Sequence, residues 1–116
     1  MTTMIQLSLW LNVAVLIPVS AALALNRPGA TRAFGERSPA RGILLSIYLS
    51  ILLVSAALLF VRDSRATVAL LVVQIVYKLT TPFTVGTVKN PVVVSNLAIS
   101  AFHIGALWVS RAMVLG

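Results

Sequence analysis

Four apolar runs, each about as long as the roughly 20 residues that a helix needs to cross a bilayer, constrain the fold of this 116-residue chain more than any other feature. The runs cover residues 4–25, 39–61, 64–85 and 91–111. Lipid offers no hydrogen bonds to the backbone, so segments of this length satisfy their N–H and C=O groups by forming helices. We therefore predict an all-α fold: an integral membrane four-helix bundle that forms a single domain over residues 1–116.

Short polar sequences separate the runs and mark where the predicted helices end and begin. Pro28 and Gly29 stop the first helix, and we expect residues 27–38 to form the longest link. The first run ends in a cleavage-like triplet at 22–24, but the segment before it has no basic residue, so we expect this helix to be retained. Start signals precede the other runs: Ser38 before Pro39, Asp63 or Ser64, and Asn90 before Pro91.

The charge of the chain agrees with a membrane location. Only 9% of the residues are charged, whereas a soluble domain has about 25%. Nine basic residues outnumber two acids, but eight of the nine flank the apolar runs and they form no basic face, so we expect the lipid bilayer and no nucleic acid as a partner.

The basic residues also predict an orientation. The first and third links hold five of them and the other side holds three: Arg27, Arg32, Arg37, Arg41 and Lys89 against Arg62, Arg65 and Arg111. The richer side normally faces the cytoplasm, so we expect the long first link there, in a bacterial plasma (inner) membrane. The arginines of residues 27–41 either only set this topology or also bind anionic lipid head groups.

Sparse polar residues inside the runs share one face of each predicted helix, at 100° per residue. We expect these faces to meet inside the bundle and to supply ligand-binding groups. They comprise Ser8 and Asn12 in the first run, Ser46 and Ser50 in the second, Gln74, Lys78 and Thr81 with Tyr77 at the edge in the third, and Asn96, Ser100 and His103 in the fourth. The opposite side of the fourth run carries the small residues Ala98, Ala101 and Gly105, which permit close packing of helices.

Pro82 interrupts the third run close to Lys78. Proline has no N–H, so it leaves the carbonyl of Lys78 without its helical donor. We expect a kink or an early helix end near residue 80, with a threonine hydroxyl such as that of Thr81 bonding the free carbonyl.

Lys78 itself has two interpretations. Its stem can snorkel to an interface roughly 10 Å away, or its ammonium can face a pocket and meet an anionic or carbonyl group of a ligand. Both acids of the chain, Glu36 and Asp63, lie in links, so Lys78 has no carboxylate partner unless one of them folds inward.

His103 is the only histidine. A buried neutral imidazole bonded to a hydroxyl or amide is the simplest interpretation. The side chain can also act as an acid or base, or ligate a haem or chlorophyll-type pigment from one side, because Trp108 follows it at a spacing similar to that of pigment-binding helices. One histidine, two acids and no cysteine cannot complete a usual metal-ligand set, so we expect no protein-only metal site, and the sequence identifies no particular cofactor.

The overall plan and the "QIVYK" segment, residues 74–78, resemble the small four-helix bacterial membrane proteins grouped around DoxX and related uncharacterised families. This resemblance implies an accessory or lipid-associated role. Small multidrug-resistance transporters are similar in size only, because their coupling depends on a glutamate in the first helix, and the first run here has no acid.

Three functions remain open. The chain is an accessory subunit or binder of an apolar ligand (a lipid, a quinone or a pigment), packed in the membrane against other subunits or a second copy. Alternatively, it is a membrane enzyme of the isomerase or cyclase type, with Lys78, Tyr77, Asn96 and His103 as acid, base or polarising groups. A small transporter comes third, because the chain lacks a coupling carboxylate.

Overall fold

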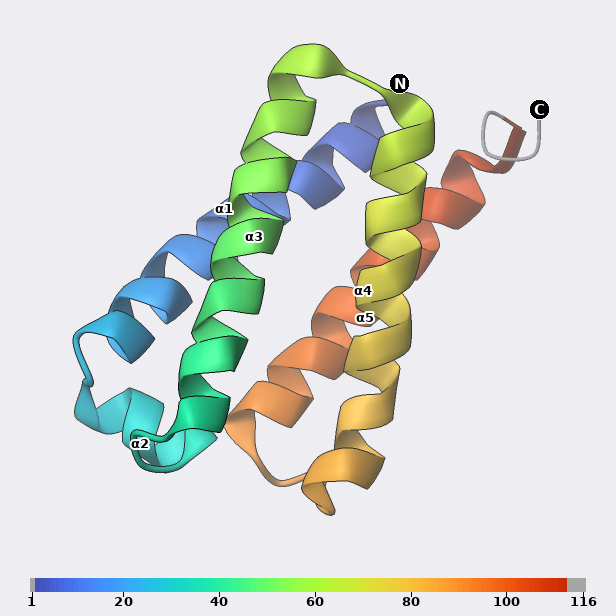
Figure 1. Ribbon diagram of the computed structural model, residues 1–116. Helices are drawn as coiled ribbons and strands as arrows, with labels where there is room; N and C mark the ends of the chain where they lie inside the picture. The colour runs from blue at the N-terminus through green and yellow to red at the C-terminus, as the bar shows by residue number, and fades with distance from the viewer. Residues whose placement is uncertain (1, 113–116) are drawn as a thin grey trace.

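The computed structural model describes residues 2–112 as four long helices and one short helix (Figure 1). The long helices are α1 (Thr3–Ala24), α3 (Pro39–Val61), α4 (Ser64–Val85) and α5 (Pro91–Val109), and the short one is α2 (Pro28–Phe34). Each long helix is long and apolar enough to cross a membrane. The longest dimension of the molecule is 44 Å, close to the roughly 40–45 Å of a bilayer with its head groups. The predicted all-α four-helix bundle is confirmed.

Local capping explains why the predicted helix starts agree with the structure. The side chains of three predicted N-cap residues accept a hydrogen bond from a backbone N–H of the first turn: Ser38 from Arg41 at 3.1 Å, Asp63 from Ala66 at 3.0 Å and Asn90 from Val92 at 2.8 Å. Pro39 and Pro91 follow their caps at the first helical position, where a missing N–H removes no hydrogen bond.

The first link differs from the predicted loop, because residues 28–34 form α2. Pro28 does end the run before it, but it also sits at the start of a new helix, a position that proline favours. The guanidinium of Arg41, which is buried, donates to the carbonyls of Leu23 at 3.2 Å and Gly35 at 2.9 Å. These carbonyls end α1 and α2, so one cation holds both helix ends against α3.

The long helices associate as two antiparallel pairs, α1 with α3 and α4 with α5, and α1 also contacts α5. Figure 1 shows the N-terminus, the α3–α4 turn and the end of α5 at one end of the bundle. The α2 helix and the α4–α5 link lie at the other end, called here the α2 end. The first and third links therefore lie on the same side of the membrane, as the helix count predicts.

The buried positions recur at spacings of three and four residues, the packing pattern of helical bundles. In α1 they include residues 5, 9, 12, 16 and 23, in α3 41, 48, 51, 55 and 58, in α4 67, 71, 74 and 78, and in α5 93, 96, 100, 103 and 106. Within residues 2–112 the buried set holds twelve polar and twelve apolar side chains, while large apolar side chains such as Phe60 and Phe83 are more than four-fifths exposed. A polar interior with an apolar exterior is the arrangement expected where lipid is the solvent.

Candidate functional site

The centre of the bundle is a hydrogen-bonded set of four side chains, one from each long helix, called here the amide cluster: Asn12 of α1, Ser55 of α3, Gln74 of α4 and His103 of α5. The Asn12 amide donates to Ser55 Oγ at 3.1 Å and to Gln74 Oε1 at 2.7 Å. Its Oδ1 accepts from Gln74 Nε2 and lies 3.1 Å from His103 Nε2.

Asn12 uses its full hydrogen-bonding capacity in this cluster. An amide side chain has two N–H donors and two acceptor lone pairs, and Asn12 engages all four. Because Oδ1 is an acceptor, His103 Nε2 carries the proton and donates. His103 Nδ1 is buried and has no hydrogen-bond partner in the described part of the chain. The cluster ties all four helices together at a depth where lipid supplies no hydrogen bonds.

A second polar set, the lysine cluster, lies toward the α2 end and consists of Tyr77, Lys78, Thr81 and Asn96. Lys78 Nζ donates to Asn96 Oδ1 at 3.3 Å and lies 4.9 Å from the centre of the Tyr77 ring. Asn96 Nδ2 reaches Thr81 Oγ1 at 3.4 Å, and Thr81 Oγ1 donates to the backbone carbonyl of Lys78 at 2.6 Å. These bonds form a closed ring that joins α4 to α5.

The hydroxyl of Thr81 supplies the hydrogen bond that Pro82 cannot donate. The carbonyl of Lys78 lacks its helical donor, and the Thr81 hydroxyl supplies one, as predicted. Of the two alternatives expected near residue 80, a kink or an early helix end, the early end does not occur, because α4 continues to Val85, the end predicted for this run. The hydroxyl bond satisfies the carbonyl locally, so the helix has no need to unwind there.

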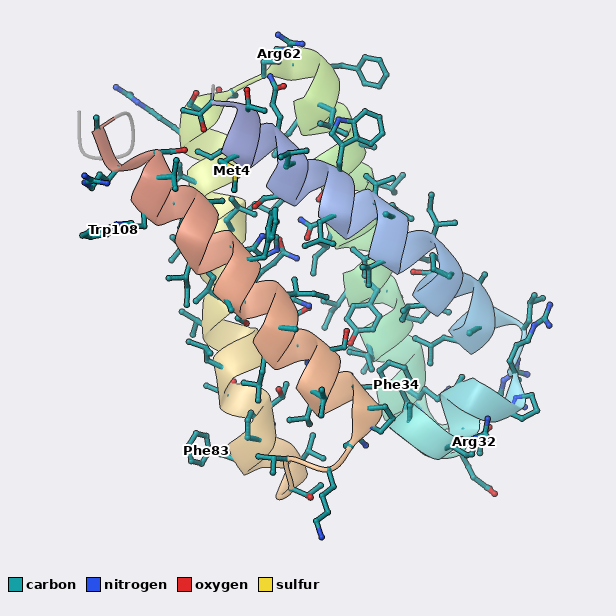
Figure 2. All side chains as sticks on the ribbon, turned by 180° about the vertical axis from the view of Figure 1, so that it is seen from behind. Met4, Arg32, Phe34, Arg62, Phe83 and Trp108 are labelled. Carbon is teal, nitrogen blue, oxygen red and sulfur yellow. The ribbon has the colours of Figure 1, made fainter. Side chains whose placement is uncertain are left out.

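A cavity of about 320 Å³ lies between α1, α2 and α5 and reaches the lysine cluster. Its walls are mostly apolar and include Val19, Ala22, Phe34 and Ile99, whereas Lys78 and Asn96 are among its few polar lining residues. Figure 2 shows how the space arises: α1 and α5 lie close together near Met4 and Trp108 and diverge toward the α2 end, where Phe34 lies at the base.

A second cavity of about 450 Å³ adjoins the first, and Phe34, Tyr48 and Asn96 line both. Tyr77 and Thr81 also line the second cavity. The hydroxyl of Tyr77 is buried without a hydrogen-bond partner among residues 2–112. The phenol ring of Tyr48 packs edge-on against Phe34, with ring centres 6.0 Å apart, so this aromatic pair forms part of the partition between the two spaces.

The predicted site residues are thus divided between two places. Lys78 and Asn96 line the smaller cavity and Tyr77, Thr81 and Asn96 the larger one, while Asn12, Gln74 and His103 lie in the amide cluster and line none of the cavities described here. Ser100 is buried and donates to the backbone carbonyl of Asn96 at 2.8 Å. Lys78 is only 4% exposed and bonds Asn96, so its amine does not snorkel to the interface in this structure.

The prediction that Ser46 and Ser50 face the interior is wrong. Both are exposed on the outer side of α3, and the Ser50 hydroxyl donates to the carbonyl of Ser46 at 2.8 Å, which satisfies it within its own helix. Ser55, which lies on nearly the opposite face at 100° per residue, takes the interior position. The signal that would have found it is the seven-residue spacing of Arg41, Tyr48 and Ser55.

The small-residue face of α5 does not pack against another helix of this chain. Ala98, Ala101 and Gly105 are exposed, and no heavy atom lies within 4 Å of a Cβ built at Gly105. Within residues 2–112 this face is therefore uncovered, and close packing of another subunit against it stays a prediction.

Comparison of the chain with protein-family models, with curated proteins and with solved structures finds no match. The two polar clusters and the cavities beside them are therefore the features that bear on function.

Proposed function

We propose that this protein binds an apolar or amphiphilic small molecule within the bilayer, in the cavity between α1, α2 and α5. The observation that carries the proposal is the shape and lining of this space, about 320 Å³ with apolar walls that end at the buried Lys78–Asn96 pair. Ligand pockets typically measure about 300–1,000 Å³ and combine apolar walls with a few polar groups that orient the ligand. Such a lipid-binding role agrees with a molecule whose exterior is apolar.

The enzyme hypothesis receives less support from the same geometry. A general acid or base must reach the substrate, and His103 is fully buried with its Nε2 engaged by Asn12. It lines neither of the cavities that Lys78, Tyr77 and Asn96 line. The four candidate catalytic residues therefore do not face one common space, which favours binding over turnover.

Filling the cavity should abolish binding. We expect Ala22→Phe, on the cavity wall of α1, to weaken the affinity for the co-purified small molecule by about tenfold or more, which corresponds to about 1.4 kcal/mol of binding free energy, and so to lower its occupancy. The phenyl ring would occupy the space that the ligand needs. Native mass spectrometry of the protein released from lipid discs measures the bound mass directly.

Ala21→Phe is the matched control, because Ala21 is the neighbouring residue of α1 and is exposed on the outer side. It should leave the bound mass unchanged. Equal occupancy in both variants and the parent chain would contradict the assignment of this cavity as the binding site.

The orientation that we propose places the α2 end at the cytoplasmic face of a bacterial plasma membrane. It is supported by five basic residues at that end, four in the two links and Arg41 in the first turn of α3, against three at the other end. The chain has no cysteine, so single cysteines can be labelled without background. Arg32→Cys and Lys89→Cys should react with a membrane-impermeant maleimide only after permeabilisation, whereas Arg62→Cys should react in intact cells; the reverse pattern would reject this orientation.

A further inference from the structure

The buried amine of Lys78 has no countercharge in the membrane part of the molecule. The two acids of the chain, Glu36 and Asp63, are both exposed in links between helices. Among residues 2–112, Lys78 Nζ donates one hydrogen bond, to the neutral amide of Asn96. An ammonium has three N–H donors, so this bond leaves two donors and the charge of the cation unmatched.

Neutral neighbouring groups only partly offset the cost of the unneutralised charge on Lys78. The Tyr77 ring, 4.9 Å from Nζ at its centre, attracts a cation through its π face. A lone ammonium away from water is nevertheless unfavourable, and intramembrane ionisable residues mark binding sites for this reason. A bound anion would neutralise Lys78, and it would have to reach the amine through a space connected to the lipid.

The 320 Å³ cavity supplies such a space. Lys78 lines it, and the walls leading away are apolar side chains of α1, α2 and α5. Lys78 lies seven residues before the end of α4, about 10 Å along the helix axis, so the anion must penetrate below the head groups. The volume lies at the lower end of the range for ligand pockets, which favours one acyl chain over two.

We propose that the occupant is a single-chain carboxylate amphiphile of the fatty-acid class. Its carboxylate accepts hydrogen bonds from Lys78 Nζ and neutralises it, and its chain lies along the apolar walls toward the divergence of α1 and α5 (Figure 2). A quinone, an alcohol or an ester would fit the walls and accept a hydrogen bond from Nζ, but it would leave the positive charge of Lys78 unneutralised. This inference rests on the proposed function and names the ligand class for the same cavity.

The test compares laurate with dodecanol as probes of the full-length protein in lipid discs, by isothermal titration calorimetry. The parent chain should bind laurate at least about tenfold more tightly than dodecanol, the range expected of a hydrogen bond to a charged group. Lys78→Met should remove this preference by weakening laurate alone, and Lys78→Arg should retain most of it. Lys89→Met is the matched control, because Lys89 is exposed in the α4–α5 link and the same charge is lost; it should keep the preference intact.

The outcomes separate the ligand class from the cavity itself. Equal binding of laurate and dodecanol, unchanged by Lys78→Met but abolished by Ala22→Phe, would overturn the carboxylate assignment and leave the cavity as a binding site. Retention of a two-chain phospholipid that laurate does not displace would overturn it as well. Failure of the parent chain to bind either probe, or any co-purified molecule, would overturn the proposed function and the inference with it. Because methionine has nearly the length of lysine and no charge, Lys78→Met should still fold, and an unchanged thermal transition verifies this.

Discussion

Replacing Asn12 with leucine should destabilise the protein by about 3 kcal/mol, the largest effect that we expect from a single polar side chain. The substitution keeps the number and branching of the side-chain heavy atoms but removes four hydrogen bonds at once. Gln74, Ser55 and His103 would each keep a buried polar group without its partner. Each such group costs about 1–3 kcal/mol, and the total is reduced because the unfolded chain in a membrane also finds hydrogen-bond partners. Steric trapping in bicelles measures the free energy of unfolding.

Ser50→Leu is the control for Asn12→Leu. It also replaces a polar residue by leucine, but on the exposed side of α3, where Ser50 bonds only within its own helix. We expect a change within about 0.5 kcal/mol. If Asn12→Leu were as mild as Ser50→Leu, the amide cluster would not hold the four helices together.

Arg41→Met should release α2 from the bundle. The change removes the guanidinium donors from the carbonyls of Gly35 and of Leu23, which keeps the backbone N–H of Asn26 at 3.3 Å, at a loss of about 2 kcal/mol. Ala33 and Phe34 line both cavities, so loosening α2 also opens the floor of the ligand site. Hydrogen–deuterium exchange by mass spectrometry should show faster exchange in residues 28–34 and little change in α4.

The control for this prediction is Arg32→Met. Arg32 lies in α2 and is exposed, and its loss removes the same charge from the same end of the molecule. Exchange in α2 should stay close to that of the parent chain. Equally fast exchange of α2 in the two variants would show that the lost charge accounts for the effect, and not the position of Arg41 at two helix ends. Exchange that is as slow in both variants as in the parent chain would show that Arg41 does not hold α2 in place.

The sequence was sufficient to locate the long helices because the signals for them are local. Their length follows from bilayer thickness, and Ser38 and Asn90 cap the backbone within two or three residues of themselves. The α2 helix was missed because Pro28 ends one helix and begins another, and sequence position alone does not separate the two roles.

The interior face of α3 was assigned wrongly for a different reason. This helix carries serines on two nearly opposite faces, and the pair Ser46 and Ser50 looked like the interior face, whereas tertiary packing placed Ser55 inside to meet Asn12. On α1, α4 and α5 the polar faces carry the larger amide and imidazole side chains, and Asn12, Gln74 and His103 could be placed inside from their sequence pattern. Serine can satisfy its hydroxyl on the i−4 carbonyl of its own helix, as Ser50 does on Ser46, so a serine identifies the interior less reliably than a larger amide or imidazole group.

The cavity could not be predicted at all. It depends on the divergence of α1 from α5 toward the α2 end and on the position of α2 beneath it, and these are properties of helix tilt and packing rather than of any motif (Figure 2). The sequence indicated only that Lys78 is a charged residue inside an apolar run. The structure shows that it lines this cavity.

The environment of His103 tests the polar interior most directly. It is the only histidine, so selective isotope labelling of histidine reports on one imidazole without any substitution. Solid-state NMR of the protein in bilayers should show through-space contacts from this ring to the side-chain amide of Asn12, which lies 3.1 Å from Nε2, and none to lipid acyl chains. Contacts to acyl chains without contacts to Asn12 would place the imidazole on the outside of the bundle and contradict the account.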